Sequence, residues 1–147
     1  MQIVRVSQKE LPDLVPLFDG YRVFYNQNSD LEAAEKFLSS RLNKNESIIF
    51  MAKVGAKAMG FTQLYFTFSS VSMEPFLILN DLYVTPDFRG LGVGEKLLTI
   101  AKSFCSNNGY KGLALETAVD NPAQYLYEKL GWKKDTDFFH YFWKNPK

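Results

Sequence analysis

The 147-residue chain contains very little cysteine or histidine, with one of each, Cys105 and His140. A lone cysteine cannot form an internal disulfide, and a structural zinc site built from several Cys or His ligands is excluded. We therefore expect no metal site, and cysteine usage that suits a reducing cytoplasm.

Excess charge and long apolar runs are also missing. Lys and Arg number 17 against 16 Asp and Glu, and the net charge of +1 offers no bulk field to gather nucleic acid or anionic membrane. No apolar run approaches the roughly 18 residues of a membrane span, and the N-terminus lacks the pattern of a secretory signal. We expect a cytoplasmic protein without nucleic-acid or membrane partners.

Core-forming residues are plentiful, since 46% of the chain is hydrophobic and 16% aromatic. The length fits one domain over residues 1–147, and no repeat or linker divides it. Apolar periodicity predicts a mixed α/β sheet with a parallel crossover beside an antiparallel hairpin. Strands are predicted over residues 2–6, 47–54, 59–69, 76–84, 112–118 and 138–143. Helices are predicted over residues 11–25, 94–107 and 122–130. A further helix is predicted to start at Ser29, because Ser29 and Glu32 fit a capping box.

A glycine-rich loop, Arg89-Gly90-Leu91-Gly92-Val93-Gly94, joins a predicted strand to a predicted helix. Glycine lets a ligand approach the backbone, and a helix N-terminus presents unpaired N–H groups to phosphate. Gly94 is followed by Glu95 rather than by the Gly-Lys-Ser/Thr ending of a Walker loop, and the spacing differs from a dinucleotide fingerprint. A phosphate cradle and a tight turn without a ligand both remain open.

Two motifs resemble those of the GNAT N-acetyltransferase superfamily. The loop matches the pattern Q/R-x-x-G-x-G/A, and the run from Asn121 to Trp132 is similar to N-x-x-A followed by a Tyr-Glu-Lys-Leu-Gly-Phe-like end. Ala123 falls one position early, and Trp132 replaces the commoner Phe. The resemblance implies a mostly antiparallel central sheet with a parallel, splayed strand pair and flanking helices. It also implies an acetyl-CoA-dependent N-acetyltransferase that needs no metal.

The resemblance assigns a set of residues to the cofactor. The loop amides would bind the pyrophosphate of coenzyme A, and the strand before the loop would pair with the pantetheine arm. Asn121 would contact the cofactor, although Asn is also a good cap for the following helix. The cofactor-binding residues predicted are Leu82, Tyr83, Val84, Arg89, Gly90, Leu91, Gly92, Val93, Gly94, Glu95, Asn121 and Tyr127.

Acetyl transfer needs a neutral amine and a protonated leaving thiol. Tyr127 occupies the position of the general-acid tyrosine of many GNAT enzymes, whereas periodicity alone would make it a packing residue. Asp81 and Glu116 are the candidates for base or amine anchor, with ordered water as the alternative. Some relatives carry a glutamate where this chain has Asn80. Tyr25 either lines the acceptor pocket or belongs to the core.

The resemblance leads us to expect a small primary amine as acceptor, such as a polyamine or an amino-acid-like amine, which attacks the thioester directly. A protein or peptide amine is the alternative among enzymes. A non-catalytic acyl-CoA-binding module is the alternative from another class. The aromatic segment 138–143 could pair across a two-fold axis, which predicts a homodimer.

Overall fold

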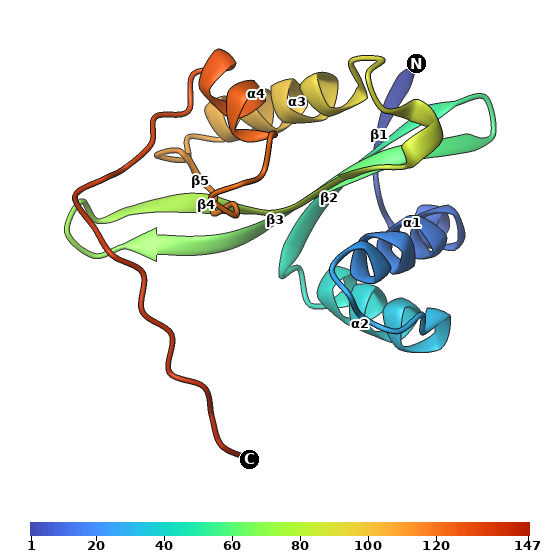
Figure 1. The fold of residues 1–147 in the computed structure, drawn as a ribbon, viewed down its shortest axis with the longest axis horizontal. Coiled ribbons are helices and arrows are strands. Elements are labelled where there is room, and N and C mark those ends of the chain that lie inside the picture. Colours follow the sequence, from blue (N-terminus) through green and yellow to red (C-terminus); the bar gives the residue numbers. More distant parts are fainter. The chain divides into compact units, whose positions relative to one another are not determined.

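A computed structural model describes all 147 residues of the chain (Figure 1). They form two compact units, Met1–Glu116 and Thr117–Lys147, which are described separately below. None of the helices is long and apolar enough to cross a membrane.

A five-stranded sheet forms the centre of the first unit, in the order β1-β2-β3-β4-β5 (Figure 1). The first three pairings are antiparallel, and β4 and β5 run parallel, which confirms the predicted mixed sheet. The strands are β1 (Gln2–Arg5), β2 (Ser47–Val54), β3 (Lys57–Ser69), β4 (Glu74–Val84) and β5 (Leu113–Ala114).

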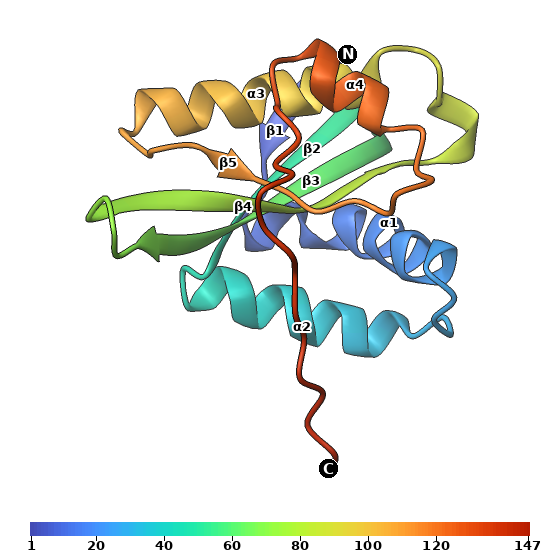
Figure 2. The same cartoon turned by 60° about the vertical axis from the view of Figure 1, so that its left-hand side comes forward.

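Helices cover both faces of this sheet. Figure 2 shows α1 (Leu11–Phe24) and α2 (Leu31–Asn43) on one face and α3 (Val93–Asn107) on the other. Two short 3-10 turns, Gln8–Glu10 and Pro86–Phe88, precede α1 and the glycine-rich loop. The second unit contains one short helix, α4 (Gln124–Lys129).

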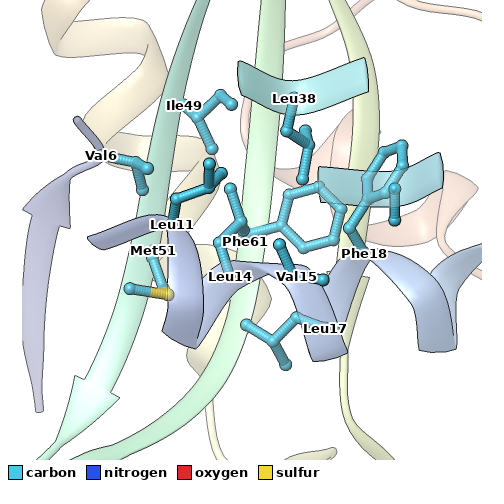
Figure 3. Packing of buried hydrophobic residues seen from close by; sticks show 11 residues of the cluster. Val6, Leu11, Leu14, Val15, Leu17, Phe18, Leu38, Ile49, Met51 and Phe61 are labelled. Carbon is cyan, nitrogen blue, oxygen red and sulfur yellow. The ribbon is translucent and has the colours of Figure 1, made fainter. Parts of the chain in front are cut away.

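The main core lies between the sheet and the α1–α2 pair (Figure 3). Leu14 and Leu38 from the two helices meet Ile49, Met51 and Phe61 from β2 and β3, and all five are fully buried. Each such side chain contributes about 1.5–3 kcal/mol by leaving water. The apolar faces of the two predicted helices are therefore the faces that pack on the sheet.

The predicted start of the second helix was wrong by one residue. Asp30 is its N-cap, because the Asp30 carboxylate accepts a hydrogen bond from the Ala33 amide at 3.0 Å. The Ser29 hydroxyl instead donates to the carboxylate of Asp19 on α1 at 2.7 Å. The Ser29–Glu32 capping box is thus replaced by an Asp30 cap and a link back to α1.

Three elements near the C-terminus differ from the prediction. The strand expected over residues 112–118 is paired only at Leu113–Ala114, and the helix expected over 122–130 spans Gln124–Lys129. The strand expected over 138–143 does not form, and its five aromatic side chains are exposed. Aromatic residues favour a strand only where a partner strand satisfies the backbone, and none pairs with this segment.

Candidate active site

The glycine-rich loop connects the end of β4 to α3, as the sequence predicted. Gly90 and Gly92 have φ values of +76° and +81°, a region that side chains with a Cβ rarely adopt. Gly92 is the N-cap of α3, and its carbonyl accepts the helical bond from Lys96. The N-terminus of α3 therefore begins within this loop, and backbone amides at a helix N-terminus are well placed to bind an anion.

Arg89 is fixed against the end of β4. Its Nε donates to the carbonyl of Val84 at 2.9 Å, and its guanidinium lies 5.4 Å from the Phe24 ring and 5.7 Å from the Tyr83 ring. The terminal guanidinium nitrogens are further donors of the kind that bind phosphate. Arg89 therefore joins the loop to β4 and α1 at the mouth of the cradle.

One edge of β4 is open along its second half. β5 pairs with β4 only at Leu77 and Ile78, whereas β3 remains paired with β4 as far as Val84. Backbone groups of Leu82–Val84 that face the β5 side consequently have no partner strand. This edge can exchange hydrogen bonds with an added extended segment.

Asp81 lies where β4 contains a bulge. Gln63 is opposite Asp81 and Leu64 is opposite Leu79, so Asn80 is an extra residue in β4. Only 3% of Asp81 is exposed. Its carboxylate accepts hydrogen bonds from Gln63 Nε2 at 2.5 Å, from Asn80 Nδ2 at 2.9 Å and from the Tyr21 hydroxyl. Burial outweighs these bonds and raises the pKa of Asp81.

Two tyrosines surround this carboxyl group. Burial and the charge of Asp81 raise the pKa of Tyr21 far above its usual value, and the same causes raise the pKa of Tyr65 to about 12. The Tyr21 ring lies 5.7 Å from Phe61 and 6.1 Å from Tyr83. Both phenols therefore stay protonated around a buried acid.

Two further predicted residues lie in the first unit. Tyr25 is the C-cap of α1, with its ring edge-on to Tyr21 at 5.0 Å. It is 51% exposed, so it is a surface residue rather than part of the core. Glu116 follows β5 and is exposed at the end of this unit. Their roles toward substrate stay predictions.

The remaining predicted residues lie in the second unit. The Asn121 side chain accepts a hydrogen bond from the Ala123 amide at 2.9 Å, which is the local capping role weighed for it. Tyr127 on α4 is buried, and its ring is edge-on to Trp132 at 6.1 Å. Their contacts with the cofactor stay predictions.

Sequence reasoning missed Gln63 and the role of Tyr21 beside Asp81. Gln63 is fully buried in β3, and its Oε1 has no hydrogen-bond partner. The only signal available was the polar pair Thr62-Gln63 between Phe61 and Leu64. Tyr21 matched the apolar spacing of α1, and that spacing gave no sign of a hydrogen bond to Asp81.

The family model for the acetyltransferase (GNAT) family matches residues 12–132. An uncharacterised N-acetyltransferase of Bacillus subtilis (strain 168), YhfO, is 47% identical over 142 residues, which cover 96% of this chain and 95% of that protein. The crystal structure of a probable acetyltransferase superposes with a TM-score of 0.94 at 37% identity, over 100% of this chain and 99% of the other.

A solved aminoglycoside N-acetyltransferase in complex with CoA shares the fold, with a TM-score of 0.80 at 20% identity over 98% of this chain and 95% of the other. The chain belongs to the GNAT family, whose members use acetyl-CoA. It is an N-acetyltransferase, as its two motifs predicted.

Proposed function

We propose that this enzyme transfers the acetyl group of acetyl-CoA to the primary amine of a small molecule. The observation that carries the proposal is the geometry of β4, whose open edge runs into the Gly90–Gly92 loop and the N-terminus of α3. The loop amides, including those of Leu91, Val93, Gly94 and Glu95, would hold the pyrophosphate, and Leu82–Val84 the pantetheine arm. Bound acetyl-CoA supplies the thioester.

The acceptor side supports a small amine such as a polyamine or an amino-acid-like amine. Asp81, the proposed base, is deep in the fold, where a folded protein surface cannot approach it. The net charge of +1 offers no strong acidic field to attract a basic protein. Tyr25 would line the entrance, and Glu116 would offer a second carboxylate to a cation.

Each candidate has a chemical task. An alkylamine has a pKa near 10.4 and must lose a proton before it attacks. Asp81, whose pKa is raised by burial, suits the role of base rather than that of an anchor in contact with the amine. Tyr127 would protonate the leaving thiolate, because a phenol is protonated at neutral pH. Asn121 would contact the cofactor in addition to capping its turn.

A test combines acetyl-CoA with polyamines, amino acids, aminoglycosides and a lysine-rich peptide, and follows the release of free CoA thiol. We expect release with a small amine. We also expect Tyr127→Phe to lower the rate about 10²-fold, the lower end for general acid–base catalysis, with nearly unchanged CoA affinity. Tyr125→Phe, on the same helix but 79% exposed, is the matched control. Release with the peptide alone would establish the protein-directed alternative, and an active Tyr127→Phe would remove that residue from the mechanism.

We also propose that two copies form a homodimer through the exposed aromatic segment 138–143. The five exposed aromatic side chains of this segment favour association, because a second copy that covers them removes apolar surface from water. Sedimentation of the purified chain would give a dimer mass, and a monomer at every concentration would contradict the proposal. The cytoplasmic location stays a prediction.

A further inference from the structure

Asp81 is too deeply buried to touch an acceptor amine directly. Its side chain is 3% exposed, and Gln63, which holds one of its oxygens, is fully buried. A base at this position therefore needs a neighbouring group that reaches the substrate and passes the proton inward. The candidates are the three side chains that donate hydrogen bonds to the carboxylate.

Only one of these donors can act as a relay. The amide NH₂ groups of Gln63 and Asn80 donate but have no lone pair that accepts a proton. The Tyr21 hydroxyl donates its proton to Asp81 while its oxygen keeps lone pairs that can accept another. Tyr21 is also only partly buried, unlike Gln63.

We infer that Tyr21 is a catalytic residue that carries a proton from the acceptor amine to Asp81. This inference rests on the proposed acetylation of an amine. One proton of the substrate ammonium passes to the Tyr21 oxygen while the Tyr21 hydroxyl proton passes to the carboxylate, so Tyr21 remains neutral and Asp81 becomes a carboxylic acid. The neutral amine then forms the C–N bond as the C–S bond breaks. The second nitrogen proton compensates for the one taken up by the leaving sulfur.

Packing and electrostatics around the pair support this role. The Tyr21 ring packs against the rings of Phe61, Tyr83 and Tyr25 at 5.7, 6.1 and 5.0 Å. Phe61 and Tyr83 are paired next to the Gln63–Asp81 pair on the same face of the sheet, which places Tyr21 beside Asp81. The raised pKa of Tyr21 keeps the phenol neutral, and the raised pKa of Asp81 makes its carboxylate a better proton acceptor. A relay needs these two properties together.

The inference is tested with four variants: Tyr21→Phe, Asp81→Asn, the double variant and Tyr65→Phe. Phenylalanine at position 21 keeps the ring packing, and thermal unfolding verifies that each variant is folded. Tyr65 interacts with Asp81 through the charge of the carboxylate, so Tyr65→Phe is the matched control. For each variant, kcat/KM is measured with the preferred amine between neutral pH and the amine's pKa, and CoA binding is measured by calorimetry.

We expect Tyr21→Phe and Asp81→Asn each to lower kcat/KM about 10²-fold near pH 7, with the double variant no worse than either single variant. The deficit should shrink as the pH rises, because solvent then deprotonates the amine. Tyr65→Phe should change kcat/KM less than about threefold, well below the loss of a general base. A Tyr21→Phe enzyme as active as wild type, a pH-independent deficit, or losses that multiply in the double variant would overturn the relay alone. A wild-type protein that binds CoA but acetylates no amine would instead overturn the proposed function and the relay with it.

Discussion

β3 approaches the end of β4 closely at Gly60, which is paired with Val84. A Cβ placed on Gly60 would lie 2.6 Å from the Tyr83 carbonyl oxygen and 3.2 Å from the Val84 Cα, whereas ordinary contact begins at 3.4 Å. Both neighbours are backbone atoms, which cannot rotate away as a side chain would. We therefore expect Gly60→Ala to push β4 away from β3 at Tyr83 and Val84.

The cost of this change follows from two opposing effects. Overpacking of a well-packed site costs about 1–3 kcal/mol, and replacing glycine by alanine returns about 0.4–1 kcal/mol by restricting the unfolded chain. The net loss is about 1–2 kcal/mol, which lowers the Tm of a chain of this size by about 3–8 °C. Displacement of the strand that we assign to pantetheine should also weaken CoA binding about three- to tenfold, equivalent to one impaired hydrogen bond.

Thermal unfolding and calorimetric titration with CoA would measure both effects. Gly112→Ala is the matched control, because a Cβ there meets nothing within 4 Å and Gly112 lies just before β5. We expect the control to match wild type in both assays. A Gly60→Ala protein with unchanged Tm and CoA affinity would show that the strands separate without cost, which would refute the reasoning about β4.

Two further predictions concern buried acids. Because the folded-state pKa of Asp81 is raised, the contribution of Asp81 to stability is lost as the pH rises from about 4 through that pKa. In urea unfolding, the free energy of unfolding of Asp81→Asn should therefore increase relative to that of wild type over this range. A difference that stays constant with pH would contradict the prediction. Asp19 accepts hydrogen bonds from Ser29 Oγ and the Asp30 amide, and these bonds lower the pKa of Asp19. In urea unfolding, Asp19→Asn should therefore reduce the free energy of unfolding by about 1.5–3 kcal/mol near pH 7, and by less as the pH falls below 3.8. Equal stability of the two proteins at pH 7 would contradict the prediction.

The sequence predicted the sheet and the cradle because both depend on local patterns. Alternating and helical apolar spacing fixed β2, β3 and α3 within a few residues, and the glycines after β4 required the loop that the structure contains. The cap of α2 was misplaced because Ser29 and Asp30 are both good caps. The choice between them depends on Asp19, which lies ten residues before Ser29 and is adjacent only in the folded chain.

The C-terminal segment shows the limit of pattern reasoning most clearly. The aromatic composition of residues 138–143 favours a strand, but a strand also needs a second strand to accept and donate its hydrogen bonds. The structure contains no such partner for this segment. The preference of these residues for a strand was therefore read correctly from the sequence. The prediction that they form a strand in the single chain was wrong.

The acid in the site depends on a single extra residue in β4. Uninterrupted alternation would place Leu77, Leu79, Asp81 and Tyr83 on one face of the sheet. The bulge at Asn80 instead pairs Leu79 with Leu64 and Asp81 with Gln63, two neighbours in β3 that face opposite sides. Asp81 thus joins Tyr21 on the α1 face, while Leu79 packs on the other. Because a one-residue shift reverses which face a side chain occupies, neither the partner of Asp81 nor the relay could be inferred from the spacing of β4 alone.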